Sequence, residues 1–434
     1  MSCLMFADDI VLLSESEEGL QNCLLELEKY ASDWDMTLNQ KKTKIMIVQA
    51  YGKTPKVDIK YQGQTLETVD SYKYLGTIIS KTGSFKQNEQ YLKGKGLKAR
   101  YAVTRSIGVN GKTSTMIKIF QQMVEPILLY NCEIAQACIP ATWDIEKFKK
   151  NMWDERIIDK VSKGFLRHIL GTHKKTAIAG IRGETGKFPL SVNIYVQMIK
   201  YWTRMLSTNS TLLQEAHLDN MERYRSGKKC WIRPIIYLLN VCDVTDINIT
   251  DIVTKPNSFA KIISDKIKEL YVKNWEANSS DKEGKLRFYF QFKKKFEFEP
   301  YLDNIPRDDR KAITKLRLSS HKLPIEVMRY QNKNQNKNWK ERKCKICNTK
   351  EVGDEWHYLT SCKNDKIIAT RSQFQEEVKK IQPQLRDFQV KDLMKYCMIL
   401  HDTSIQLTTS VFVKEMLNAY TDAVEEEEGS CCIM

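Results

Sequence analysis

Two adjacent carboxylates stand inside an apolar run near the start of the chain. The stretch LMFADDIVLL covers residues 4–13 and contains Asp8 and Asp9. Unpaired carboxylates are costly in an apolar setting, so this pair needs either a turn that exposes it or a cation that neutralises it. If residues 4–7 and 10–13 are strands, both side chains lie at the tip of a tight hairpin. The sequence therefore predicts a β-hairpin with an acidic tip.

The segments that follow predict a small α/β unit. Residues 16–34 carry apolar side chains at three- and four-residue spacings, which is typical of an amphipathic helix, and Ser16 is placed to cap it. Patterns typical of β-strands follow at residues 44–48, 57–61 and 72–80.

From about residue 86 the sequence becomes basic and helical. A capped helix is expected from Ser114, with Phe120 and Met123 on its apolar face and with Pro126 bending it. Aromatic residues interleave with lysines over residues 286–302, where core packing is favoured over stacking on nucleic-acid bases. The expected fold class is α+β and mostly α-helical.

The charge of the chain favours a polyanionic partner. Its 434 residues include 69 Lys and Arg against 54 Asp and Glu, a formal net charge of +15. Nucleic acid is the leading partner, ahead of an anionic membrane, and a merely Lys-rich solvated surface is the alternative. With no transmembrane segment and no signal peptide in view, the chain is expected to be intracellular, in the nucleus, the cytoplasm or both.

A second cluster of chemistry-bearing residues lies in CKICNTKEVGDEWHYLTSC, residues 344–362. Cys344, Cys347, His357 and Cys362 form a C-x2-C-x9-H-x4-C set. Four such ligands in a short segment suit a closed, tetrahedral and therefore structural Zn²⁺ site. The alternative is four unrelated residues in a chain with 12 cysteines.

Several ordered motifs resemble one enzyme family. FADDIVLLSES, LNQKKTKIM and YKYLGTIIS look like the last three palm motifs of reverse transcriptases from non-LTR (LINE-type) retrotransposons. VEPILLYNCEIA resembles the thumb helix of that family, and ETGKFPL and IKYWTRML resemble the segment after it. LRLSSHKLPIEVMRY, followed by the Cys/His set, resembles its C-terminal CCHC zinc knuckle. The resemblance covers most of residues 1–365 and implies RNA-directed DNA polymerisation.

The resemblance also implies roles for particular residues. Asp8 and Asp9 match the hairpin carboxylates that hold Mg²⁺, and Lys42 matches a lysine near the incoming nucleotide. The primer-grip turn is matched by Tyr74, Leu75 and Gly76. For Tyr74 and Leu75, simple sheet packing is at least as good an explanation.

One part of the family's active site has no match. That site needs a further aspartate from an earlier palm strand, and fingers that also precede the hairpin. Asp144, Asp154 and Asp159 are expected to be solvated surface residues and offer no substitute. We therefore expect the isolated chain to lack polymerase activity and to retain nucleic-acid binding. A domesticated, non-enzymatic RNA- or DNA-binding adapter and a truncated gene product are the alternatives.

These expectations divide the chain into five parts. They are a partial palm (1–85), a helical thumb (86–206), a helical connector (207–335), a CCHC zinc knuckle (336–366) and a helical C-terminal segment with an acidic tail (367–434). The chain ends in CCIM, a C-a-a-X form that offers Cys431 for prenylation and a lipid anchor. The preceding EEEE at 425–428 would be repelled by an anionic leaflet, and chance termination is the alternative.

Overall fold

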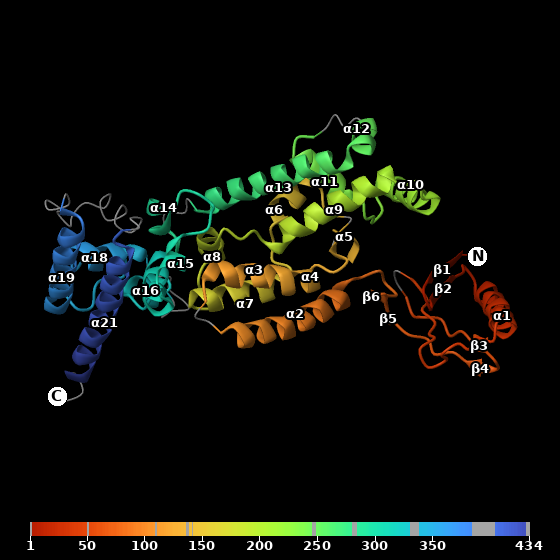
Figure 1. The fold of residues 1–434 in the computed structure, drawn as a ribbon, viewed down its shortest axis with the longest axis horizontal. Helices are drawn as coiled ribbons and strands as arrows, with labels where there is room; N and C mark the ends of the chain where they lie inside the picture. The colour runs from red at the N-terminus through yellow and green to blue at the C-terminus, as the bar shows by residue number, and fades with distance from the viewer. Residues whose placement is uncertain are drawn as a thin grey trace. The chain divides into compact units, whose positions relative to one another are not determined.

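The computed structural model describes residues 2–49, 52–108, 111–135, 139–140, 142–244, 249–279, 284–329, 338–383 and 404–430. The chain forms two compact units, Met1–Leu92 and Lys93–Met434 (Figure 1). The fold is mostly helical with a few short strands, which confirms the expected fold class at this level. The finer division into five parts stays a prediction.

Three short antiparallel hairpins and one long helix make up the described part of the N-terminal unit before residue 86. The hairpins pair β1 (Ser2–Phe6) with β2 (Asp9–Leu13), β3 (Lys60–Tyr61) with β4 (Gln64–Thr65), and β5 (Ser71–Tyr74) with β6 (Thr77–Ser80). Helix α1 (Glu17–Asp33) begins after Ser16, whose hydroxyl oxygen accepts a hydrogen bond from the Gly19 N–H. The acidic hairpin and the capped helix are therefore confirmed.

The core of this unit lies between α1 and the β3–β4 hairpin. It is built from Leu24, Ile45, Ile59, Tyr61 and Leu66. The strand expected at 44–48 is wrong as a regular strand, because Ile45 makes only an isolated parallel bridge with Thr68. Of the strand expected at 57–61, only Lys60–Tyr61 is regular. Burial of single side chains, rather than a continuous ladder, explains these two apolar patterns.

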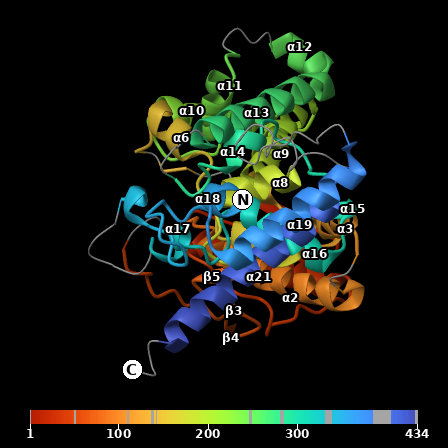
Figure 2. The ribbon, with the colours of Figure 1, turned by 90° about the vertical axis from the view of Figure 1, so that its left-hand side faces the viewer.

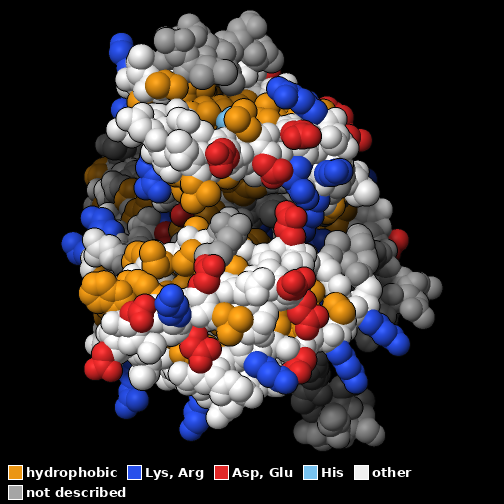
Figure 3. All heavy atoms as spheres, turned by 90° about the vertical axis from the view of Figure 1, so that its right-hand side faces the viewer, with side chains coloured by type: hydrophobic (Ala, Val, Ile, Leu, Met, Phe, Trp, Pro, Cys, Tyr) orange, Lys and Arg blue, Asp and Glu red, His pale blue; other side chains and the backbone are white. Residues whose placement is uncertain are grey.

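Several large apolar side chains of the N-terminal unit are exposed. Met5 is 74% exposed and Phe6 63%, both on β1, and Trp34 after α1 is 67% exposed. Figure 3 shows hydrophobic side chains in view among charged ones on one face of the molecule. The described residues therefore leave the Met5 and Phe6 side chains of the β1–β2 hairpin largely exposed.

The described part of the second unit is built from helices. In chain order they are α2 (Lys86–Ile107, which begins in the first unit), α3 (Thr113–Met123), α4 (Glu125–Leu128), α5 (Cys132–Ala135), α6 (Ile145–Asn151), α7 (Asp159–Leu170), α8 (Ile178–Thr185), α9 (Leu190–Ser207), α10 (Thr211–Arg225), α11 (Arg233–Val241), α12 (Ile249–Thr254), α13 (Pro256–Ser279), α14 (Tyr289–Phe292), α15 (Tyr301–Asn304), α16 (Arg307–Arg317), α17 (Pro324–Val327), the 3-10 helix η1 (Trp339–Glu341), α18 (Glu355–Thr360), α19 (Asp365–Ile381) and α21 (Gln406–Ser430).

Two groups of helices organise this unit. The long helices α9 and α13 pack side by side (Figure 1). Toward the C-terminus, α21 packs against both α16 and α19 (Figure 2), and Phe374 of α19 stacks on Phe412 of α21 at a ring-centroid distance of 4.3 Å. No described helix is long and apolar enough to cross a membrane.

The helix expected from Ser114 starts one residue earlier and has a different cap. The Ser114 N–H donates to Asp303 Oδ1 at 2.9 Å, and its hydroxyl donates to the same carboxylate. A side chain from α15 therefore caps α3, so the local cap prediction was wrong. Met123 is 59% exposed and does not belong to the buried face. The helix breaks at Val124, and Pro126 lies in the first turn of α4, as the bend predicted.

The aromatic stretch at 286–302 packs in the interior, as expected. Tyr289 and Phe292 are buried, and Lys293 is 2% exposed and forms a buried ion pair with Glu299. Glu299 also accepts from Arg317 Nη2 at 3.0 Å. Arg317 in turn holds Glu184 with two hydrogen bonds, from Nε at 3.0 Å and from Nη2 at 2.8 Å. This buried network joins α8 and α16 to the segment between α14 and α15.

Candidate metal centre and acidic hairpin

The tip of the β1–β2 hairpin exposes both aspartates. Phe6 pairs with Asp9, which leaves Ala7 and Asp8 as a two-residue turn. Ala7 takes a positive φ of 52°, the backbone conformation that such tight hairpin turns require. Asp8 and Asp9 are exposed and form no ion pair with any residue that the structure describes. Their carboxylates are therefore available to a cation.

The other residues singled out in this unit lie on a second hairpin and beside it. Leu75 and Gly76 have positive φ values of 43° and 82° and form the β5–β6 turn. The Tyr72 hydroxyl donates to the Lys42 backbone oxygen at 3.0 Å, which ties the segment of Lys42 to β5. Tyr74 and Leu75 are half-buried, in keeping with sheet packing. The structure thus brings Lys42 close to the strand that leads into the predicted primer-grip turn.

No third metal-ligating side chain joins Asp8 and Asp9 within the described residues. Asp154 is exposed as expected, and Asp144 caps α6 by accepting from the Lys147 N–H at 2.7 Å. The expectation that Asp159 is a solvated surface residue was wrong, because its side chain is only 1% exposed. Its carboxylate accepts from Arg182 at 3.4 Å and from the Leu190 N–H at 3.3 Å, so it has a structural role.

The Cys/His set is brought together in space. The ligand atoms of Cys344, Cys347, His357 and Cys362 all lie within 4.8 Å of one another. Thiolates bound at about 2.3 Å to a tetrahedral Zn²⁺ lie about 3.8 Å apart, so only small movements would bring the four atoms onto one ion. Three soft thiolates and one imidazole also form a donor set that binds zinc in preference to magnesium or calcium. The residues therefore fit a structural zinc ion.

Local secondary structure explains how these ligands converge. Cys344 lies in a short hairpin-like segment held by two backbone hydrogen bonds. The Cys344 N–H donates to the backbone oxygen of Glu351 at 2.9 Å, and the Gly353 N–H donates to the backbone oxygen of Arg342 at 2.8 Å. His357 lies in α18, whose cap Asp354 accepts from the His357 N–H at 2.9 Å. Cys362 follows the end of that helix, with its N–H bonded to the His357 oxygen at 2.8 Å.

The imidazole of His357 is oriented by a carboxylate. Its Nδ1 lies 2.7 Å from Glu351 Oε2, and its Nε2 lies 3.3 Å from Cys347 Sγ. The Ser361 hydroxyl also donates to Glu351 at 2.9 Å. A carboxylate behind a ligating histidine fixes the ring and its tautomer, which is a recurrent feature of metal centres. Sequence spacing did not reveal this role of Glu351.

The thiols affect one another's proton affinity. A hydrogen bond from Cys362 lowers the pKa of Cys344, and the same contact together with burial raises the pKa of Cys362. Burial opposes the charge on His357, but the neighbouring Cys344 thiolate and Glu351 outweigh it and raise the pKa of His357 to about 9. The lowered pKa of Cys344 favours a thiolate at the centre, and a divalent cation that binds there would displace the protons of Cys362 and His357.

A buried carboxylate holds the metal-centre helix to the rest of the unit. Glu355, the first residue of α18, is fully buried and accepts from Ser319 Oγ at 2.7 Å and from Arg287 Nη2 at 2.8 Å. His321 Nε2 lies 3.0 Å from the same carboxylate. Burial raises the pKa of Glu355, but its contacts with His321 and Arg287 outweigh burial and lower the pKa to about 2. The LRLSSH segment, residues 316–321, therefore holds α18 in place, and with it the ligand His357.

Residues 1–79 match the family model described as reverse transcriptase (RNA-dependent DNA polymerase). The match supports a reverse transcriptase domain at this end of the chain. It includes every residue that the sequence analysis assigned to catalysis or to nucleotide and primer binding: Asp8, Asp9, Lys42, Tyr74, Leu75 and Gly76. No curated protein and no solved structure matches the chain. Cys431 lies outside the described residues, so its prenylation stays a prediction.

Proposed function

We propose that the chain is the C-terminal part of a non-LTR (LINE-type) retrotransposon reverse transcriptase, acting on an RNA template and a DNA primer or target inside the cell, in the nucleus or cytoplasm. The observation that supports this best is the exposed acidic hairpin inside the segment that matches reverse transcriptases. The ordered motifs further along the chain support the non-LTR type. The Cys/His centre supports a zinc knuckle after the polymerase region.

In this proposal the two hairpin carboxylates, Asp8 and Asp9, hold Mg²⁺. Bound Mg²⁺ ions in nucleotidyl transfer activate the primer hydroxyl and stabilise the leaving pyrophosphate. Hard carboxylate oxygens are suitable ligands for such ions. Lys42 contributes a positive charge near the nucleotide triphosphate, and the β5–β6 turn at Leu75 and Gly76 orients the primer strand.

We expect this chain by itself to show no polymerase activity. Among the described residues Asp8 and Asp9 have no third carboxylate beside them, and two ligands alone do not hold a two-metal geometry. The assay is primer extension on an RNA template with Mg²⁺. Robust extension that Asp8→Asn abolishes and Asp33→Asn leaves intact would contradict the expectation, because Asp33 is an exposed carboxylate outside the hairpin.

The second candidate function, non-enzymatic RNA or DNA binding, is favoured by the net charge of +15. We expect binding to be driven mainly by phosphates and to weaken steeply with salt. The slope of log affinity against log salt should be about −0.7 per contacted phosphate for a single strand. Fluorescence anisotropy with a labelled oligonucleotide at several salt concentrations measures it. A flat salt dependence, or no binding at low salt, would contradict this expectation.

A further inference from the structure

A large cavity in the second unit is rich in lysine. Its volume is about 770 Å³, and it lies between the 171–176 loop, α16, the 319–327 segment and α21. Among the described residues that line it, two are acidic, Asp308 and Glu326. The six lysines that line it are Lys175, Lys285, Lys311, Lys315, Lys322 and Lys414.

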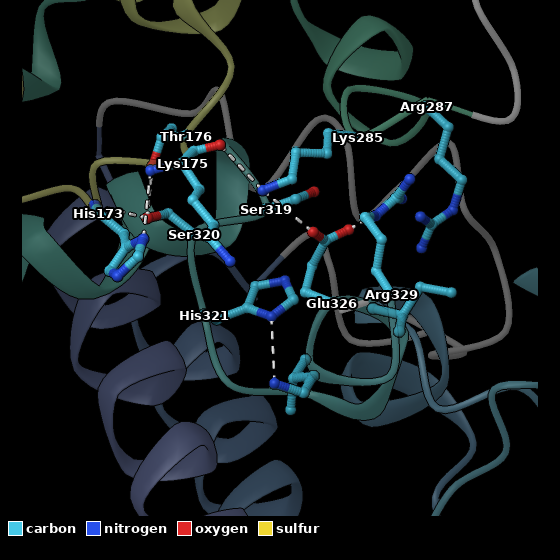
Figure 4. Close-up of polar contacts among 12 residues, drawn as sticks. His173, Lys175, Thr176, Lys285, Arg287, Ser319, Ser320, His321, Glu326 and Arg329 are labelled. Atoms are coloured by element: carbon cyan, nitrogen blue, oxygen red, sulfur yellow. Dashed lines mark hydrogen bonds and ion pairs between the residues drawn. The ribbon is translucent and has the colours of Figure 1, made fainter. Parts of the chain in front are cut away.

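The walls of this lysine cavity are held in place by polar contacts (Figure 4). Ser320 Oγ accepts from the His173 N–H at 3.0 Å and lies 2.8 Å from Thr176 Oγ1, which fixes the loop. Lys285 Nζ donates to the Lys175 backbone oxygen at 3.1 Å and lies 3.3 Å from Glu326 Oε2. The cavity is therefore built by contacts between distant segments and is formed before any ligand arrives.

Both acidic groups of the lysine cavity are already neutralised. Asp308 pairs with Lys311 at 2.7 Å, and Glu326 pairs with Lys285 at 3.3 Å and with Arg329 at 3.1 Å. Lys315 and Lys322 have no carboxylate partner in the described part of the chain. Thr172 also lines the cavity, and its buried Oγ1 has no hydrogen-bond partner among the described residues. The cavity thus keeps unpaired positive charge and an unused hydroxyl, which suits an anion.

The lysine cavity shares a wall with the metal centre. His321 lines the cavity and contacts Glu355 of α18. Tyr420 of α21 lines it as well and packs on Tyr358, at a ring-centroid distance of 5.0 Å. The Tyr358 hydroxyl in turn lies 3.1 Å from Cys344 Sγ. A ligand that contacts Tyr420 would therefore be separated from the Cys344 thiol by the Tyr358 ring.

We propose that the lysine cavity binds the phosphodiester backbone of a nucleic-acid strand, with Lys315 and Lys322 paired to its phosphates. The proposal rests on the proposed nucleic-acid binding and assigns it a site. The cavity is much larger than one phosphate group needs, and its lysines come from several elements, as a strand with successive phosphates requires. Among the described residues that line it, Tyr420 is the one Phe, Tyr or Trp, and the His321 ring is engaged by Glu355. Contacts to phosphates without base stacking predict little sequence preference.

The test compares two double variants of the zinc-loaded full chain. Lys315→Gln/Lys322→Gln removes the unpaired charges of the cavity. Lys150→Gln/Lys261→Gln removes two exposed lysines of α6 and α13 that do not line it. Anisotropy with a fluorescein-labelled 15-nucleotide strand of mixed sequence, as RNA and as DNA, measures binding. We expect the cavity variant to bind about tenfold more weakly at 0.1 M salt and to lose about 1.4 from the salt slope, about 0.7 for each of two phosphates. The control variant should stay near wild type.

Lysine acetylation of the wild-type protein gives an independent readout. Bound strand should protect Lys315 and Lys322 from an acylating reagent, as mass spectrometry detects, and should leave Lys150 reactive. Wild-type binding with equal affinity in both variants and no protection would overturn this proposal while leaving nucleic-acid binding intact. No binding by the wild type would overturn both. Inorganic pyrophosphate bound in the cavity, with strand affinity unchanged in the variants, would assign the site to a small anion instead.

Discussion

The purified protein is expected to contain one zinc ion per chain, and Cys347→Ser is expected to lose it. Cys347 is one of four ligands whose donor atoms lie within 4.8 Å of one another. Removing one thiolate from a closed structural site leaves three ligands and an open position. We expect the segment 340–365 to lose its local order in this variant, while the helices before residue 320 stay folded.

Size explains why the metal matters so much here. The segment that surrounds the centre has a helix of six residues, α18, and a single isolated bridge between Lys343 and Val352. Its fully buried apolar side chains, Tyr358 and Leu359, are too few to order it alone. Zinc binding by comparable short segments releases on the order of 10 kcal/mol, because the site forms only on folding. Metal is therefore expected to supply most of the local stability.

Metal analysis and limited proteolysis test this prediction together. Cys347→Ser should be zinc-free and should be cleaved near residue 350, where the wild type resists. Cys3→Ser is the matched control, because Cys3 is exposed in β1 and is remote in sequence from the centre. If the wild-type protein contained no zinc and still resisted proteolysis near residue 350, the four residues would lie close together without binding a metal.

Sequence patterns predicted the elements whose cause is local. The hairpin at Asp8 and the helix after Ser16 depend on residues within a few positions, so spacing and capping rules locate them. The α3 cap failed because its partner is Asp303, which is far away in the sequence. The strand at 44–48 failed because apolar alternation does not reveal whether a partner strand runs alongside Ile45.

The candidate site was predictable only in its ligands. Cys344, Cys347, His357 and Cys362 lie within 19 residues, so their spacing is visible in the sequence. The residues that hold α18 in place, Ser319 and His321, act through Glu355 across more than 30 positions. Such contacts depend on tertiary packing, and so does the burial of Asp159. The lysine cavity is likewise assembled from segments that no spacing rule connects.

Arg317→Met is expected to be strongly destabilising. Arg317 is fully buried, holds Glu184 with two hydrogen bonds and also contacts Glu299 at 3.0 Å. Without the guanidinium, Glu184 would keep the hydrogen bond from the Tyr301 hydroxyl at 2.6 Å but no counter-charge among the described residues, whereas Glu299 would still pair with Lys293. Removing one partner from a buried ion pair costs about 3–5 kcal/mol, because the remaining charge stays desolvated. Urea unfolding followed by circular dichroism measures the loss.

The pairing of Glu184 with Arg317 also predicts the outcome of a double substitution. Glu184→Leu/Arg317→Met removes both charges, so its destabilisation should be smaller than the sum of the two single losses. Lys311→Met on the same helix is the control, since Lys311 pairs with an exposed carboxylate and should change stability little. Equal urea midpoints for Arg317→Met and Lys311→Met would show that the network contributes nothing to stability.

Because Arg317 ends α16 just before Ser319 and His321, its loss should also displace the residues that hold Glu355. Weaker zinc retention in Arg317→Met, but not in Lys311→Met, would then link this buried network to the metal centre.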